Sequence, residues 1–156
     1  MSTSETSGLV TDLAGLQDLV GKHAGYTEWK VMDQDRVNQF ADATDDHQYI
    51  HVDPERAKDS PFGGTVAHGF LTLSLVAPIS GELVTVSDAK TGVNYGLDRV
   101  RFPAPLPVGA EWRGGAEVIE VTDVPGGKQM KVKVTVEVKG SDKPAMVAES
   151  LVRLYG

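Results

Sequence analysis

Apolar and polar residues follow a helical period in the first half of the chain and alternate one by one in the second half. In the first half, leucines spaced three apart predict an N-terminal helix over residues 9–25, after a Ser/Thr-rich start at residues 1–8 that we expect to be disordered. A short strand is expected over residues 28–32. Asp33 is a good helix N-cap, and the apolar stripe after it predicts a helix that ends near Thr44.

Two further helical segments follow. Residues 54–58 begin with a proline that comes directly after Asp53, which is typical of a helix start. Residues 67–83 are apolar nearly all round, so we expect a buried helix at the centre of the domain. Pro78 should kink this helix or end its first part.

The second half of the chain has the period of two that is typical of strands with one face in water. The alternation is clearest in residues 130–138, where methionine and valines point one way and lysines, threonine and glutamate the other. A turn is expected at residues 125–127 (Pro-Gly-Gly). The strands predicted in this way cover residues 93–102, 111–121, 130–138 and 145–155.

These elements predict an α+β fold made of a single domain over residues 1–156, in which a curved antiparallel sheet wraps around a central helix. Such a sheet leaves open edges, whose unpaired backbone groups must be covered. Pairing of edges between two copies covers them, so the sequence predicts a homodimer.

Composition narrows the range of functions. The net charge is −7, which disfavours nucleic acid as a partner, and the chain has no cysteine, which excludes disulfides, thiolate metal sites and a cysteine nucleophile. No apolar run approaches the roughly 20 residues of a membrane helix, and the start lacks the order of a signal peptide. We therefore expect a cytoplasmic protein without a membrane partner.

Candidate catalytic side chains are concentrated in residues 40–54, which contain four aspartates and two histidines. A carboxylate and an imidazole are common proton-transfer groups, and an apolar surround would move the pKa of each toward neutrality. Most of these residues also have a structural explanation: Asp42 as a helix-end charge, Asp45 and His47 as loop residues, and Asp53 as a cap. The spacing matches no familiar metal motif, so we expect no metal.

A glycine-rich loop at residues 62–71 runs into the expected central helix. Free backbone N–H groups at a helix start can bind a developing oxyanion, and Gly69 has no side chain that would block an approaching carbonyl. The glycines could also simply form a tight turn. For His68, a structural role in the core is favoured over direct catalysis.

Together these two stretches resemble the MaoC-like dehydratase family, which includes the (R)-specific enoyl-CoA hydratases. The family motif has the form Thr/Ser-Gly-Asp-x-Asn-Pro-Ile/Leu-His-x-Asp, and residues 44–53 read TDDHQYIHVD. A later helix start with His-Gly is matched by residues 66–71 (VAHGFL). Residues 94–97 (NYGL) and 100–105 (VRFPAP) look like the subgroup related to nodulation protein N. The resemblance spans roughly residues 28–156.

The resemblance implies a hot-dog fold, a homodimer, Asp46 and His51 as the catalytic pair, and the Gly69 N–H as oxyanion donor. Three positions depart from the motif: Asp45 stands for the usual glycine, Gln48 for asparagine and Tyr49 for proline. The extra carboxylate of Asp45 could raise the pKa of Asp46 or distort the loop.

The function expected from the resemblance is that of an (R)-specific enoyl-CoA hydratase, which reversibly adds water to a trans-2-enoyl-CoA or an enoyl-acyl carrier protein without a cofactor. A hot-dog thioesterase and a non-catalytic acyl-thioester-binding dimer remain alternatives.

Substrate contacts are expected from His68, Phe70, Ser74, Asn94 and Arg101. Leu71, Leu73 and Leu75 could line an acyl tunnel beside Phe70, although core packing is their default role. In a chain this acidic, coenzyme A needs a local basic patch. Its candidates are Arg99, Arg101, Arg113, Lys131 and Lys133.

Overall fold

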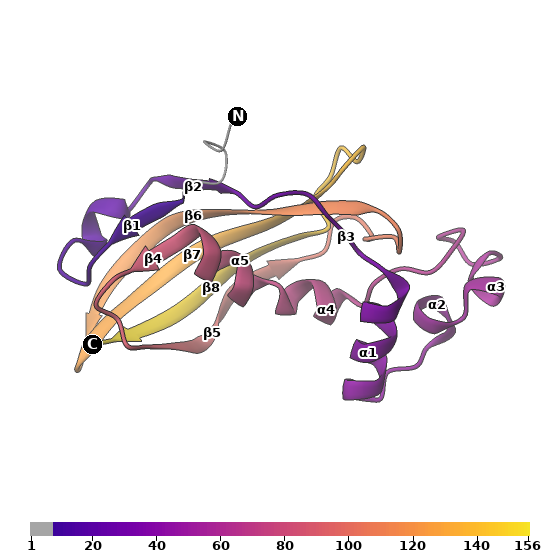
Figure 1. Cartoon of the computed structure of the whole chain (residues 1–156), viewed down its shortest axis with the longest axis horizontal. Coiled ribbons are helices and arrows are strands. Elements are labelled where there is room, and N and C mark those ends of the chain that lie inside the picture. The colour runs from indigo at the N-terminus through magenta and orange to yellow at the C-terminus, as the bar shows by residue number, and fades with distance from the viewer. Residues whose placement is uncertain (1–7) are drawn as a thin grey trace.

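The second half of the chain, in which apolar and polar residues alternate, forms the long strands of one antiparallel sheet (Figure 1). The computed structural model describes residues 8–156. The strands run in the order β2-β6-β7-β8-β5, and β3 also pairs with β6. Their bounds are β2 (His23–Tyr26), β3 (Lys30–Val31), β5 (Thr91–Arg101), β6 (Glu111–Val124), β7 (Gly127–Val138) and β8 (Met146–Tyr155). The four predicted long strands and the turn at residues 125–127 are confirmed.

The period of two in β7 places one side of the strand in the core, as predicted. Met130, Val132, Val134 and Val136 are at most 3% exposed, while the residues between them face outward. The neighbouring β8 buries Met146 and the alternate residues after it in the same layer. The sheet therefore has one apolar face, and this face must be covered by another element.

The covering element is the helical segment formed by α4 (Gly69–Ser74) and α5 (Val76–Leu83), which lies against the inner face of the curved sheet (Figure 1). The two helices meet at Leu75. A proline at position i has no N–H for the carbonyl of residue i−4, and its ring crowds that carbonyl. Pro78 therefore leaves the Ser74 carbonyl without its helical partner, and the predicted break occurs at this point.

The prediction that the central helix is buried on all sides is wrong for the single chain. Leu71, Leu75 and Ile79 are buried, but Phe70 is 72% exposed, and Ala77 and Pro78 are also exposed. One stripe of the segment therefore faces away from the sheet. Exposed apolar surface of this kind is typical of an interaction or ligand-binding surface.

The predicted N-terminal helix over residues 9–25 is wrong. This region contains strand β1 (Leu9–Thr11), a short 3-10 helix (Leu16–Leu19) and β2. Leucines three residues apart fit the period of a 3-10 helix as well as that of an α-helix, and the glycines at 15, 21 and 25 interrupt a longer helix. The expected disorder of residues 1–8 lies, apart from Gly8, outside the described residues. Strand β1 pairs in parallel with a short strand that was not predicted, β4 (Val84–Val86).

Three helices, α1 (Gln34–Thr44), α2 (Tyr49–Val52) and α3 (Pro54–Ala57), lie beyond one end of the sheet (Figure 1). The Asp33 carboxylate caps α1 by accepting the Arg36 N–H at 2.8 Å, and Asp53 caps α3 through the Arg56 N–H at 3.2 Å. Both predicted caps are confirmed. In the described residues no helix is both long and apolar enough to cross a membrane.

Candidate active site

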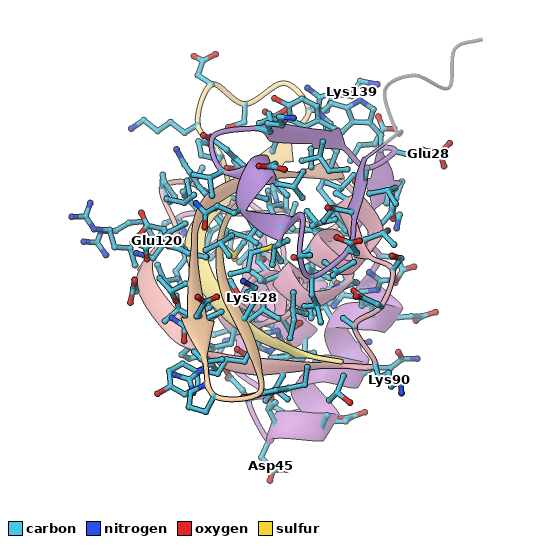
Figure 2. All side chains as sticks on the ribbon, turned by 90° about the vertical axis from the view of Figure 1, so that its left-hand side faces the viewer. Glu28, Asp45, Lys90, Glu120, Lys128 and Lys139 are labelled. Carbon is cyan, nitrogen blue, oxygen red and sulfur yellow. The ribbon has the colours of Figure 1, made fainter. Side chains whose placement is uncertain are left out.

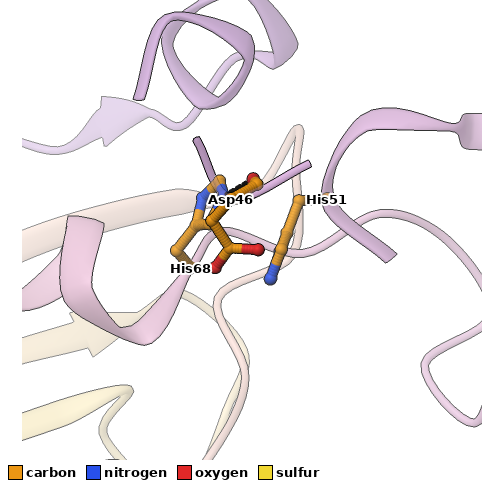
Figure 3. A group of neighbouring side chains, drawn as sticks. All are labelled: Asp46, His51 and His68. Carbon is orange, nitrogen blue, oxygen red and sulfur yellow. Dashed lines mark hydrogen bonds between the residues drawn. The ribbon is translucent and has the colours of Figure 1, made fainter. Parts of the chain in front are cut away.

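Three side chains from separate segments meet where the helical end of the molecule joins the start of α4 (Figure 3). Asp46 lies in the loop after α1, His51 in α2, and His68 directly before α4. Their nearest carboxylate oxygens and imidazole nitrogens all lie within 4.8 Å of one another. The predicted pair Asp46 and His51 is therefore brought together, with His68 as a third member.

His51 is held in one orientation by the backbone. It is 7% exposed, and its Nδ1–H donates to the Val66 carbonyl oxygen at 2.7 Å. The Gln34 side chain donates to the carbonyl of His51 itself at 2.7 Å and accepts from the Thr65 hydroxyl. Because Nδ1 carries the proton, Nε2 is the nitrogen that offers a lone pair to a proton.

Asp46 presents its carboxylate to this imidazole (Figure 3). Within residues 8–156, no direct hydrogen bond joins the two side chains; the carboxylate accepts only a long contact from the Gln48 N–H, at 3.4 Å. Two atoms that each lie about 2.8 Å from a bridging water can be as much as roughly 5.6 Å apart. The spacing at the site therefore suits one water molecule held between a carboxylate and an imidazole.

His68 contacts both of these residues. Its Nε2–H donates to the Asp46 carbonyl oxygen at 3.0 Å, and its ring stacks on that of His51 with centroids 3.8 Å apart. His68 is 2% exposed, and within the described chain its Nδ1 has no partner. Burial lowers the pKa of His68, although the hydrogen bond to Asp46 partly opposes this effect. The structure thus favours a neutral, supporting His68.

Each of the three residues keeps one group that could bind a metal ion. His51 Nδ1 and His68 Nε2 both donate to carbonyl oxygens, so neither of these two nitrogens offers a lone pair. The Asp46 carboxylate, His51 Nε2 and the unpartnered His68 Nδ1 are left, which is as many protein ligands as a catalytic zinc site uses. The expectation of no metal remains a prediction.

A second carboxylate–imidazole pair lies on the surface close by. His47 Nε2 and Asp42 Oδ1 are 2.9 Å apart, with both side chains at least half exposed. This pair has the same chemical groups as the candidate site, but its imidazole lacks the burial and the orienting backbone contact of His51. The structural explanation of Asp42 and His47 is therefore supported.

Asp45 occupies the glycine position of the family motif and adopts a backbone conformation that glycine favours. It is the residue after α1 and takes a left-handed conformation (φ 62°), for which glycine is ordinarily preferred. Its side chain points away from the molecule at the end of α1 (Figure 2). An aspartate tolerates this backbone conformation better than most residues, so the substitution is compatible with the loop.

Gly69 begins α4 beside a cavity of about 310 Å³ that also contains His51. In the described chain its N–H has no acceptor, as expected for the first residue of a helix. A side-chain carbon at this position would lie 3.5 Å from the Phe102 ring, so the glycine keeps the cavity open. The cavity is closed on one side by residues 102–106 and Ala145.

A larger cavity, of about 650 Å³, lies elsewhere, between α4–α5 and strands β5 and β8. Three of the predicted substrate contacts, Phe70, Ser74 and Asn94, line it together with Leu73. Leu71 and Leu75 are core residues instead. Neither Asp46 nor His51 lines this cavity, but Phe70 follows Gly69 directly, so the first turn of α4 lies between the two cavities.

The sequence did not indicate three supporting groups: Gln34, the Val66 carbonyl and the Phe102 ring. Gln34 and Val66 reach the site through contacts between residues far apart in the chain, and no local pattern marks such contacts. Phe102 was visible only as part of the stretch shared with the nodulation protein N subgroup. Arg101, predicted as a substrate contact, lies outside both cavities.

Comparison with known proteins identifies the family of the chain. A family model described as "MaoC like domain" matches residues 16–140. The chain is 51% identical over 142 residues to 3-hydroxyacyl-thioester dehydratase Z of Mycobacterium tuberculosis H37Rv, covering 90% of this chain and 94% of that protein. The chain belongs to the MaoC-like dehydratase family.

Other members and neighbours extend this result. Nodulation protein N of Rhizobium leguminosarum bv. viciae is 44% identical over 140 residues, with 87% of this chain and 86% of that protein covered. The solved (R)-hydratase from A. caviae involved in PHA biosynthesis superposes with a TM-score of 0.72 at 24% identity, over 86% of this chain and 96% of that chain. The predicted hot-dog fold is confirmed, and the chain is an enzyme of the hydro-lyase class.

Proposed function

We propose that this MaoC-like enzyme is an (R)-specific enoyl-CoA hydratase, which reversibly converts trans-2-enoyl-CoA and water into (R)-3-hydroxyacyl-CoA. The observation that carries the proposal is the meeting of the Asp46 carboxylate with the free Nε2 of a buried, oriented His51. A carboxylate and an imidazole nitrogen at this spacing suit the activation of one water molecule between them. The relative named 3-hydroxyacyl-thioester dehydratase Z supports a thioester substrate.

In the proposed reaction, the water between Asp46 and His51 attacks the β-carbon of the enoyl thioester. Asp46 takes the proton of this water as general base, while His51 Nε2 orients the water. The electron pair of the double bond moves toward the thioester carbonyl, and a proton returned from the pair to the α-carbon completes the addition. Acid–base assistance of this kind is typically worth about 10²- to 10⁴-fold in rate.

The Gly69 N–H is the proposed donor to the enolate-like oxygen that develops during this step. It has no competing acceptor in residues 8–156, and Gly69 lines the cavity shared with His51. One such donor is typically worth about 3 kcal/mol in the transition state. The thioester carbonyl would lie in the smaller cavity, and the acyl chain would pass Phe70 toward the larger one.

The proposed enzyme is a homodimer joined at the edge strand β5. Among the described residues this strand has no neighbour on its outer side, and it exposes Val93, Tyr95 and Leu97, each at least 40% accessible. Phe70 on α4 is exposed as well. A second copy at this edge would cover the apolar stripe of the central helix and satisfy the open strand.

The test is hydration of crotonyl-CoA, followed through loss of the enoyl absorbance, by the wild type, Asp46→Asn and His51→Gln. Each variant should keep its fold and lose at least about 10²-fold in kcat. Asp42→Asn and His47→Gln make the same chemical changes in the exposed pair and should retain wild-type turnover.

Stereochemistry is read from the product with a dehydrogenase specific for (S)-3-hydroxyacyl-CoA, which should not oxidise it. Oxidation of the product would contradict (R) specificity, and full activity of Asp46→Asn would contradict the proposed base. Release of free thiol without loss of the double bond would instead indicate a thioesterase.

A further inference from the structure

Five basic residues on strands β5, β6 and β7 differ in how their charges are neutralised. The Lys131 ammonium lies 2.8 Å from Asp98 and 3.8 Å from Glu120, and its hydrogen bond to Asp98 raises the pKa of Lys131. Arg113 pairs with Glu137 at 2.8 Å and lies between two aromatic rings. Both of these cations already form ion pairs with carboxylates of the same chain.

Arg99, Arg101 and Lys133 are different. They line one cavity of about 230 Å³ on the outer side of β5, β8 and β7, together with Val147 and Glu149. Within residues 8–156, none of the three lies within 4.0 Å of a carboxylate oxygen. Glu149 is the strand neighbour of both Arg99 and Lys133 and lines the cavity, while Glu117, the neighbour of Lys133 on β6, does not line it.

This concentration of positive charge is unusual for the chain. The net charge is −7, so a random patch of surface is more often acidic than basic. Three cations that share a hollow repel one another unless an anion lies between them. The cluster is therefore suited to a ligand with several negative charges, such as one bearing phosphate groups.

The basic cavity adjoins the candidate active site around the end of the sheet. Arg101 precedes Phe102, and Phe102 lines the cavity that contains His51 and Gly69. On the next strand, Ala145 lines the site cavity and Val147 lines the basic cavity. Neighbouring residues of two segments thus line the two hollows, so the hollows lie close together at this end of the sheet.

From this arrangement we infer that Arg99, Arg101 and Lys133 form the site for the phosphate groups of the coenzyme A part of the substrate. The inference rests on the proposed function, since it requires a thioester at Asp46 and His51. The flexible pantetheine arm would run from the thioester past Phe102 to the phosphates. The site would supply the local positive field that an acidic protein needs to bind an anionic substrate.

The experiment compares two thioesters of the same crotonyl group, one of coenzyme A and one of N-acetylcysteamine, which carries no phosphate. The Arg99→Gln/Lys133→Gln variant should lower the ratio of the two kcat/KM values about tenfold, mainly through KM, because each exposed cation contributes roughly two- to fivefold. Higher salt should shrink the difference, since it screens exposed charges. Lys22→Gln, an exposed lysine on another part of the surface, should leave the ratio unchanged.

An equal loss with both thioesters, or no change with either, would overturn the inference. An effect confined to a crotonyl-acyl carrier protein would overturn the assignment to coenzyme A. If the wild type turned over neither thioester, the proposed function would fail. Titration of free coenzyme A would then still test the cluster, because the double variant should bind it about tenfold more weakly than the wild type.

Discussion

Replacing His68 should lower the activity strongly while changing the free energy of unfolding little. In His68→Leu, the Asp46 carbonyl loses its 3.0 Å hydrogen bond, which is worth about 0.5–1.5 kcal/mol. Asp46 is exposed, so water can replace part of this bond. The substitution also removes the buried, unpartnered Nδ1, whose desolvation costs about 1 kcal/mol or more. The two effects nearly cancel, and the free energy of unfolding should change by less than about 1 kcal/mol.

The effect on activity should be much larger. His68 fixes the backbone of Asp46 and stacks on the ring of His51, so its loss lets the two groups move relative to each other. A misplacement of about 1 Å can cost roughly 10²-fold in rate. We expect His68→Leu to lower kcat 10- to 100-fold, and His68→Gln, whose amide nitrogen can donate to the same carbonyl, to recover most of it.

The assays are urea unfolding and crotonyl-CoA hydration on the same preparations. Unchanged turnover in His68→Leu, or equal loss in His68→Gln, would refute the supporting role of His68.

The pH dependence of unfolding gives an independent check on His68. Burial lowers its pKa below the 6.5 of an unperturbed histidine, so between these two values the unfolded chain binds more protons than the folded one. The stability contributed by the neutral ring is fully present above pH 6.5 and is lost as the pH falls through the folded pKa. His68→Gln lacks this contribution, so its free energy of unfolding should fall less on acidification than that of the wild type.

Two backbone positions give further predictions. A side-chain carbon at Gly114 would lie 2.5 Å from the Ile79 side chain, so Gly114→Ala should cost about 1–3 kcal/mol in urea unfolding, and adding Ile79→Ala should reduce that penalty; additive losses would contradict the close contact. Asp45 has a φ of 62°, so Asp45→Val should be about 1–2 kcal/mol less stable than Asp45→Gly, and equal stability of the two would contradict the left-handed conformation.

The sequence predicted those parts of the fold that local patterns specify. The alternation in residues 130–138 identified β7 and its buried face, and Asp33 and Asp53 marked two helix starts. The helix expected over residues 9–25 failed because its leucine spacing fits a 3-10 helix as well, and its end was drawn into the sheet by pairing with β6. Pairing between distant strands leaves no signal in a local window.

The site, like the fold, was predicted only where a local motif marks it. Asp46, His51 and Gly69 came from the two motifs, and the structure places all three at one end of α4. The roles of Val66, Gln34 and His68 in holding them depend on contacts between separate segments, which no spacing in the sequence reveals.

The most direct test of a shared action of Asp46 and His51 on one water is a double-mutant cycle. The kcat of crotonyl-CoA hydration would be measured for the wild type, Asp46→Asn, His51→Gln and the combined variant. If the two groups act as a unit, the combined variant should be only about as slow as the slower single variant. Losses that multiply, so that the combined variant equals the product of the two single effects, would show independent action and contradict the account.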